Sequence, residues 1–328
     1  MQHTLAQTIE LQGIGLHSGA ETVLRLKPAS ISQGIRFIRV DVNGKNNVIP
    51  AQWDYVSDTR LCTIVANQDG VSVGTIEHLM AALAACAIDN ADIELDGPEI
   101  PIMDGSAQPF IDAILQAGIK TQAAPRRAIR ILKPITLADG DKKVMLRPGI
   151  GSEFQVEIDF LHPEIGRQMA RINLIGDEFF TKIARARTFG FLHEVTALRA
   201  MGLALGGSME NAIVLDQDSI MNPEGLRSPT EFAQHKLLDA VGDIYLAGAP
   251  ILGVFEGVKP GHQMNNLILH ELFAHPECWN YVELYMDQTQ IGLAVGIGSS
   301  DEANPVSQMI PVIPEPSGLP LTSRAFCD

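Results

Sequence analysis

The sequence predicts an α+β protein made of two similarly built domains, each with a β-sheet packed on helices. Of its 328 residues, 46% are hydrophobic and 19% are charged, which is typical of a folded globular protein. That length suits two domains of ordinary size. Strand-like and helix-like patterns also follow one another in the same order in both halves, which indicates two domains of similar plan. One large α+β domain with two helical layers is the alternative.

The first half is expected to contain a helix, a strand and a second helix. Thr75 to Ala87 is strongly apolar, and Leu79 to Ile88 is an uninterrupted apolar run of ten residues. A membrane span needs ~20 such residues, so we expect a buried helix and no transmembrane segment. Asp92 to Asp96 is the predicted strand. Ala107 to Ala117 is amphipathic and stops at Gly118, which is a helix C-terminal signal.

A change of pattern near residues 119–128 predicts a domain boundary at about residue 124. The domains are then residues 1–124 and 125–299. Residues 300–328 are rich in Ser, Asn and Pro, and we expect a mostly unstructured tail. The second half is predicted to contain strands and helices in the order Arg130–Thr136, Lys143–Leu146, Ser152–Phe160, helix Pro229–Ala247, strand Ile251–Phe255 and helix His262–Phe273.

A segment rich in Gly, Leu and Met at about residues 188–222 predicts an insertion in the second domain. It is expected to form a short strand and a short helix with glycine hinges. Apolar groups on such a segment suit a greasy ligand, although ordinary core packing is the commoner explanation.

Charge and cysteine usage restrict the function. The 24 Lys and Arg residues against 39 Asp and Glu residues give a net charge of −15, which argues against a general binder of nucleic acid or anionic membrane. No basic residue precedes an apolar block at the N-terminus, so we expect no secretory signal. The four cysteines lie far apart and lack paired spacing, which favours reduced thiols and a cytoplasmic location; they are Cys62, Cys86, Cys278 and Cys327.

The strongest chemical signal is the pair His235 and Asp239. Ser228 and Glu231, with a proline between them, predict a capping box at the start of this helix. Residues four apart share one helix face, about 6 Å apart along the axis, so an imidazole and a carboxylate are able to converge on one ion. Asp243 continues the same stripe one turn further on. A solvated polar face is the alternative.

A second signal is Glu77 and His78 at the start of the apolar helix. Burying these groups is costly unless they have partners. The alternative is that both side chains face solvent in the first helical turn, where a glutamate also interacts favourably with the helix dipole. His78, His235 and Asp239 together make a two-histidine, one-carboxylate set, which is a pattern of hydrolytic zinc sites with one position left for water. Glu77 is then placed to act as the general base on that water.

Three weaker signals remain. His262 follows Gly261 at a predicted helix start, where a surface histidine is the usual interpretation. Gly13 to Gly19 resembles a dinucleotide loop only superficially, because its spacing is wrong and no long helix follows. Glu99 to Ser106 reads as a turn-forming loop.

Six motifs in order identify a family resemblance over residues 1 to about 285. They are Gly13–Gly19 (GIGLHSG), Thr75–Leu83 (TIEHLMAAL), Asp96–Ser106 (DGPEIPIMDGS), Ala186–Gly190 (ARTFG), His235–Asp239 (HKLLD) and Gly261–Asn266 (GHQMNN). Together they resemble the zinc-dependent UDP-3-O-acyl-N-acetylglucosamine deacetylases of Gram-negative lipid A biosynthesis. The resemblance implies a cytoplasmic hydrolase that releases acetate from the UDP-linked acylated amino sugar, the committed step of that pathway. Its active site is expected between the two domains.

The resemblance also implies roles for individual residues. Zinc would be bound by His78, His235 and Asp239, with Glu77 as general base. His262 would be the cationic acid, positioned by Asp243, while Lys236 and Thr188 would hold the developing oxyanion. The remaining matches are to substrate contacts: Asp159 and Phe160 for uridine, Lys259 for the diphosphate, and the inserted segment with Phe189, Gly206 and Gly207 for the acyl channel.

Two other functions stay open at this level. One is a metal-dependent amidohydrolase acting on another acylated sugar or a peptide. The other is a catalytically silent zinc-binding module, against which the presence of Glu77 and His262 beside three ligands argues, since a structural site closes with a fourth ligand. We expect a monomer with a small-molecule substrate, no nucleic-acid partner and no membrane span.

Overall fold

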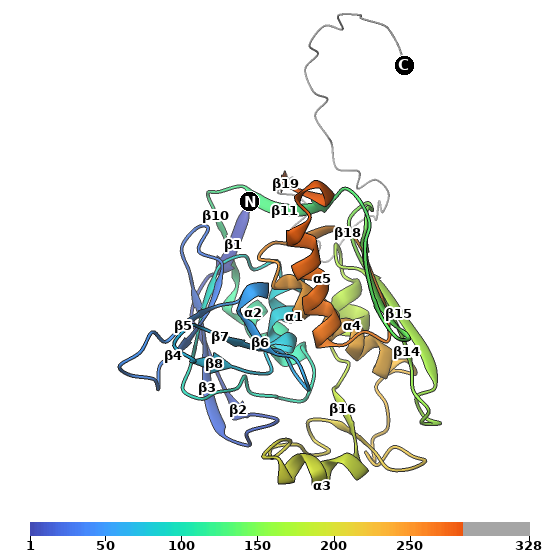
Figure 1. The fold of residues 1–328 in the computed structure, drawn as a ribbon. Helices are drawn as coiled ribbons and strands as arrows, with labels where there is room; N and C mark the ends of the chain where they lie inside the picture. Colours follow the sequence, from blue (N-terminus) through green and yellow to red (C-terminus); the bar gives the residue numbers. More distant parts are fainter. Residues whose placement is uncertain (285–328) are drawn as a thin grey trace, which may run out of the picture. The chain divides into compact units, whose positions relative to one another are not determined.

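Alternating apolar and polar residues in the first half form a five-stranded sheet. β3 (Glu21–Pro28) shows the pattern, since it buries Thr22, Leu24 and Leu26 on one face. The strand order is β2-β3-β9-β4-β5, with β4 and β9 parallel and all other neighbours antiparallel. The computed structural model describes residues 1–284 (Figure 1). The other strands of this half are β1 (Gln2–Leu5), β2 (Ile9–Ile14), β4 (Ile35–Arg39), β5 (Val48–Pro50), β6 (Val56–Asp58), β7 (Ile64–Ala66), β8 (Ser72–Val73), β9 (Ala91–Leu95) and β10 (Ile119–Gln122).

Both helices predicted in the first half are present. α1 (Glu77–Ala85) is two residues shorter at each end than the predicted helix, and all but its last residue are buried. A helix that is apolar all round must be covered on every side, and α1 packs on α2 (Gln108–Ala117) and on α4 of the second half. Thr75 has a φ of 55°, a left-handed conformation that no helix interior accepts, so the chain turns sharply just before α1.

The second half is organised around the central strand β18 (Ile251–Val258). β13 pairs with it antiparallel, while β11 and β14 pair with it in parallel. The sheet has seven strands, with β12 beyond β13, β15 beyond β14 and β19 beyond β11. Their bounds are β11 (Arg126–Ile131), β12 (Ile135–Asp139), β13 (Lys142–Arg147), β14 (Ser152–Asp159), β15 (Arg167–Asn173) and β19 (Trp279–Leu284).

The single strand predicted at Arg130–Thr136 is wrong. β11 ends at Ile131 and β12 begins at Ile135, because Pro134 has no N–H for a ladder. The backbone N–H groups of Leu132 and Lys133 donate instead to the carbonyl of Cys278.

The predicted helices of the second half are α4 (Glu231–Tyr245) and α5 (His262–Ala274). The predicted capping box of α4 is wrong, since the helix begins at Glu231 and no side chain caps it. The Glu231 carboxylate is fully buried and accepts hydrogen bonds from the backbone N–H of Arg187 at 3.1 Å and from its Nε at 2.9 Å. This ion pair draws Glu231 away from the cap.

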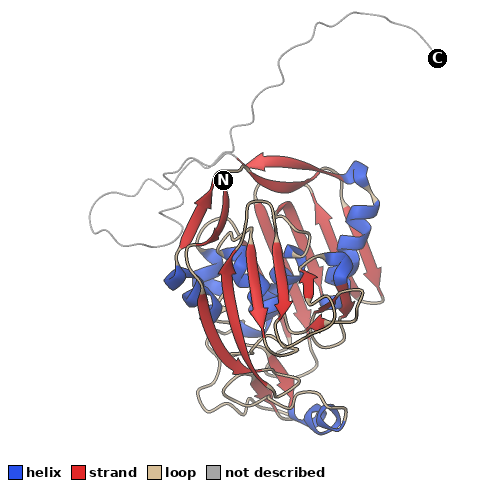
Figure 2. Cartoon of the chain, turned by 90° about the vertical axis from the view of Figure 1, so that its left-hand side faces the viewer, coloured by secondary structure: helices blue, strands red, loops and turns tan. Residues whose placement is uncertain are grey.

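Helices lie between the sheets of the two halves. Figure 1 shows α1, α2, α4 and α5 between β2–β5 on one side and β14 and β15 on the other, and Figure 2 looks onto the strands from the first side. This architecture confirms the α+β class. β10 pairs with β1, whereas β11 joins the second sheet, but the boundary at residue 124 stays a prediction. Short helical turns occur at Trp53–Tyr55, Phe179–Ile183 and Pro276–Cys278.

The inserted segment contains the expected short strand and short helix. β16 (Phe189–Phe191) pairs in parallel with β17 (Ile213–Leu215), and α3 (Leu192–Ala200) follows β16. No residue of α3 is buried, and the helix lies apart from α1 and α4 (Figure 1). The expected tail at residues 300–328 lies outside the described residues. Among the helices described, none has the length and apolarity to cross a membrane.

Candidate metal centre and active site

The site forms where α1 meets α4. Gly242 of α4 lies against α1, and a β-carbon at this position would overlap the carbonyl oxygen of Glu77. Only glycine permits this approach of the two backbones. It brings the first turn of α1 into the interior, where Glu77 is 3% exposed and His78 is 4% exposed. The alternative that these two side chains face solvent is therefore wrong.

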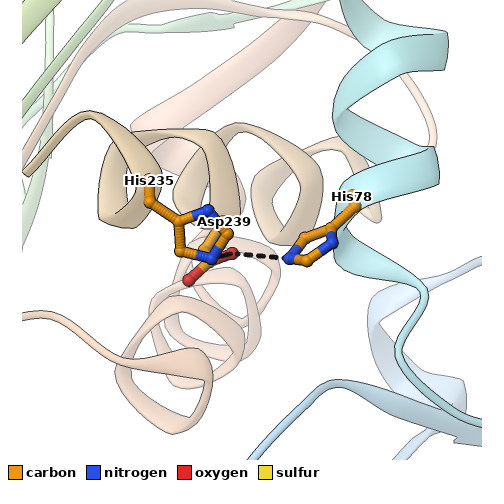
Figure 3. Close-up of side chains that lie close together, drawn as sticks. All are labelled: His78, His235 and Asp239. Atoms are coloured by element: carbon orange, nitrogen blue, oxygen red, sulfur yellow. Dashed lines mark ion pairs between the residues drawn. The ribbon is translucent and has the colours of Figure 1, made fainter. Parts of the chain in front are cut away.

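Three side chains converge at this helix crossing (Figure 3). His78 comes from α1, whereas His235 and Asp239 come from α4, and all three are buried. Nε2 of His78 lies 3.6 Å from Oδ1 of Asp239, and Nε2 of His235 lies 3.4 Å from the same oxygen. One potential ligand atom from each residue lies within 4.8 Å of the other two. This grouping fits one metal ion bound by two imidazoles and a carboxylate.

The hydrogen bonds around the cluster also fit a cation. Oδ1 of Asp239 is buried and has no hydrogen-bond partner, which is costly for a carboxylate oxygen unless an ion binds it. Its other oxygen, Oδ2, accepts a hydrogen bond from Nζ of Lys236 at 2.9 Å. Burial opposes ionisation, but the neighbouring groups, among them the ammonium of Lys236, outweigh it and hold the pKa of Asp239 well below its usual range. The group is therefore an anion ready to bind a metal.

A backbone carbonyl orients the ring of His235. Its Nδ1 lies 3.0 Å from the carbonyl oxygen of Ala186. Because a carbonyl only accepts, Nδ1 carries the proton and Nε2 keeps its lone pair toward Asp239. Burial lowers the pKa of His235 to about 3. The ring is thus neutral near pH 7, as a metal ligand must be.

Glu77, His262 and Asp243 form a chain of ionisable groups beside the cluster. Nδ1 of His262 lies 2.9 Å from Oδ2 of Asp243, and its Nε2 lies 3.7 Å from Oε1 of Glu77. Burial alone would lower the pKa of His262, but the two carboxylates outweigh it and raise the pKa to about 9. Burial raises the pKa of Glu77. A carboxylate and an imidazolium therefore face each other in a water-poor site.

The residues predicted to contact uridine and diphosphate lie together. Nζ of Lys259 is 3.1 Å from Oδ2 of Asp159 and 2.8 Å from Oδ2 of Asp141. Phe160 is half-buried, with its ring centroid 5.7 Å from that of Phe189. Phe189 in turn lies 6.3 Å from the ring of His235 and 5.5 Å from Nζ of Lys236. A row of aromatic rings thus joins this surface to the metal centre.

Thr188 and the two glycines of the insertion contact the first half of the chain. The N–H of Thr188 donates to the carbonyl of Gly105 at 2.8 Å. Gly206 donates to the carbonyl of Leu16 at 3.1 Å, and a β-carbon on Gly206 would overlap the carbonyl oxygen of Gly15. A β-carbon on Gly207 would make only ordinary contacts, with the side chain of Leu16 and the carbonyl oxygen of Ala204 each 3.5 Å away.

Comparison with known proteins decides the family. The family model described as UDP-3-O-acyl N-acetylglycosamine deacetylase matches residues 2–274. The UDP-3-O-acyl-N-acetylglucosamine deacetylase of Phenylobacterium zucineum (strain HLK1) is 51% identical over 278 residues, covering 85% of this chain and 95% of the relative. The chain belongs to this deacetylase family. Proteins of the same name from Shewanella sp. (strain ANA-3) and Shewanella baltica (strain OS155 / ATCC BAA-1091) are each 47% identical over 283 residues, covering 86% of this chain and 92% of the relative.

In this member of the deacetylase family, sequence patterns missed two residues that hold the site together. Glu99 is buried and accepts hydrogen bonds from Oγ1 of Thr75 at 2.7 Å and from the N–H groups of His17 and Ser18 at 2.9 and 2.8 Å. An acid between apolar and proline residues of the loop was the available signal. Thr63 contacts both Glu77 and Asp243, and nothing in its sequence neighbourhood indicates this.

Proposed function

We propose that this chain is a zinc-dependent hydrolase that deacetylates UDP-3-O-acyl-N-acetylglucosamine, producing UDP-3-O-acyl-glucosamine and acetate in lipid A biosynthesis. One observation carries the proposal. His78, His235 and Asp239 are clustered, and Oδ1 of Asp239 is buried without a hydrogen-bond partner. Glu77 and His262 lie beside this cluster. The names of the relatives identify the proposed substrate, and the sequence similarity covers most of this chain and most of each relative.

The three clustered residues would hold zinc. When bound, zinc would supply Lewis acidity to the acetamide carbonyl and to the attacking water. Two imidazoles and one carboxylate would leave part of the coordination sphere free for these oxygens. In the described part of the chain, this cluster is the only group of its kind.

Glu77 would remove a proton from the attacking water. Burial raises its pKa toward neutrality, which suits a general base. His262 faces it at 3.7 Å and is cationic near pH 7, so it would protonate the departing amine. Lys236 keeps an ammonium group 2.9 Å from Asp239, where it would stabilise the developing oxyanion together with Thr188.

Two surfaces would select the substrate. Asp159 and Phe160 would contact uridine and Lys259 the diphosphate, in keeping with their clustering. The inserted segment would hold the acyl chain along Phe189, Gly206 and Gly207. Phe160 and Phe189, one from each surface, have ring centroids 5.7 Å apart, and the ring of Phe189 lies 6.3 Å from that of His235, which supports placing both surfaces next to the metal centre.

We also infer a cytoplasmic location. Cys62, Cys86 and Cys278 are buried free thiols, which suits a reducing compartment. A monomeric state stays a prediction that analytical ultracentrifugation would test.

Acetate release from the UDP-sugar tests the proposal. The purified chain should release acetate, lose activity with a chelator and regain it when zinc is added. Activity on another acylated sugar or peptide, with none on the UDP-sugar, would favour a different amidohydrolase. Zinc binding without hydrolysis of any of these compounds would favour a silent module.

A further inference from the structure

Thr63 links the two helices that carry the site. It precedes β7, is 1% exposed, and uses each of its polar groups. Its N–H donates to Oε2 of Glu77 at 3.1 Å, and its hydroxyl donates to Oδ1 of Asp243 at 2.5 Å. Its carbonyl accepts from the N–H of Ile76, directly before α1, at 3.4 Å. One residue thus contacts the start of α1 and the middle of α4.

These contacts close a ring of hydrogen-bonded and charged groups. From Thr63 the ring runs through Asp243 to His262, with 2.9 Å between Oδ2 and Nδ1. It continues across 3.7 Å from Nε2 of His262 to Oε1 of Glu77, and returns to Thr63 through the other oxygen of Glu77. Thr63 is therefore hydrogen-bonded directly to the proposed base, Glu77, and through Asp243 to the proposed acid, His262.

We propose that Thr63 is a positioning residue of the proposed deacetylation: its hydroxyl fixes the carboxylate of Asp243, and thereby the ring of His262, relative to Glu77. The inference rests on the proposed function. It adds to that function a residue that touches no substrate and acts through the two proton-transfer groups.

The physical reason is the number of donors around Asp243. Oδ2 accepts from His262 and from Nδ2 of Asn265 at 2.9 Å, while Oδ1 accepts from the hydroxyl of Thr63. Without that hydroxyl, Oδ1 is a buried carboxylate oxygen with no donor, which is costly. The carboxylate then gains by rotating, and any rotation moves Oδ2 out of line with Nδ1 of His262. The remaining bonds to Oδ2 also change, because the charge of the carboxylate is then shared with two donors, His262 and Asn265, instead of three.

Isosteric variants separate the hydroxyl from the space it occupies. Thr63→Val keeps the shape and the backbone bond to Glu77 but loses the bond to Asp243, whereas Thr63→Ser keeps the hydroxyl. Thr4→Val is a matched control, since Thr4 is 2% exposed and donates its hydroxyl to the carbonyl of Asn90 at 2.7 Å in the first half. Each protein is purified with zinc and assayed for zinc content, kcat and KM.

We expect Thr63→Val to lower kcat by about 10- to 100-fold, the scale seen when a hydrogen bond that orients a residue of a metal site is lost. KM and zinc content should stay within about twofold of the parent, since neither ligands nor substrate contacts change. Thr63→Ser should restore most of kcat, and Thr4→Val should keep it. A parent-like kcat in Thr63→Val, or a loss that Thr63→Ser fails to restore, overturns the inference.

A second measurement needs no substrate. In zinc-loaded protein labelled with ¹⁵N-histidine, the Nδ1 proton of His262 reports its bond to Asp243 by NMR. Its resonance should move in Thr63→Val and stay at the parent position in Thr63→Ser and Thr4→Val. An unmoved resonance in Thr63→Val overturns the inference even if the parent chain releases no acetate, an outcome that by itself would refute only the proposed function.

Discussion

Nδ1 of His262 lies 2.9 Å from Oδ2 of Asp243, and these two buried residues are 19 positions apart in the chain. Burial would favour the neutral ring, but Asp243 and Glu77 raise the pKa of His262 to about 9. The imidazolium therefore persists near neutral pH and is lost as the pH rises through that value. A proton donor with this property should set the basic limb of the pH profile.

Asp243→Asn should move the basic limb of kcat/KM to lower pH and lower the maximal activity. Asparagine can still orient the ring, but the charge that stabilises the imidazolium is gone. His262→Ala should lose more activity, and the double variant should be scarcely worse than His262→Ala, because Asp243 acts through that histidine. Losses that add in free energy, or an unmoved basic limb, would show that the two residues act separately.

Glu77→Gln should keep normal zinc content and lower kcat at least ~10²-fold, the usual scale for a general base. The amide keeps the size of the side chain but takes up no proton near neutral pH. Glu10→Gln is the control, since Glu10 pairs with Arg25 on an exposed sheet face. Turnover within a few-fold of the parent would rule out Glu77 as the base.

His235→Ala and Asp239→Ala should each lower zinc affinity, with activity falling in parallel with metal content. Loss of a ligand should lower zinc affinity by more than the ~10- to 100-fold seen when a residue that hydrogen-bonds to a ligand is lost. His3→Ala tests a histidine that is also buried but lies outside the cluster, and it should keep its zinc. Metal analysis after dialysis against graded chelator measures the affinity. Full occupancy in both ligand variants would contradict the assignment.

Substrate selection should divide between two surfaces. Phe160→Ala should mainly raise KM, since it removes stacking area for the uracil ring. Gly207→Leu should narrow the range of acyl lengths accepted, because its surroundings have space and its side chain would enter the proposed channel.

Gly206 is expected to behave differently from Gly207. Any side chain on Gly206 would overlap the carbonyl of Gly15, so Gly206→Leu should displace the loop and lower activity on every acyl length. Values of kcat/KM across a series of acyl lengths separate these outcomes. A chain-length profile that Gly207→Leu leaves unchanged would contradict the channel assignment.

The buried ion pair of Arg187 and Glu231 should contribute strongly to stability. Both residues are at most 2% exposed, and Nε of Arg187 lies 2.9 Å from Oε1 of Glu231. Glu231→Ala leaves a buried guanidinium with an incomplete set of acceptors and should lower the free energy of unfolding by ~3–5 kcal/mol. Glu153→Ala, which breaks an exposed pair with Arg171, should cost ~0–1 kcal/mol. Equal denaturant midpoints for the two variants would refute this difference.

Local patterns alone were enough to predict several elements and part of the site. The apolar run of α1 and the alternation of β14 predicted both elements, because covalent geometry fixes helical and strand periods. The same rule placed His235 and Asp239 on one face of α4. The split of the strand predicted at Arg130–Thr136 was missed although Pro134 marks it in the sequence. Only the tertiary structure shows that Leu132 and Lys133 donate to the carbonyl of Cys278 instead.

Tertiary structure decided which groups meet. The pairing of His78 with α4 requires two helices from different halves to approach at Gly242, and only the assembled core brings them there. Thr63 and Asp243 are 180 residues apart, and no local period relates them. Contacts of this range follow from packing of the whole chain. The sequence therefore determined many of the elements and two of the three proposed metal ligands. Packing decided the place of the third proposed ligand, the burial of Glu77 and the ring that Thr63 closes.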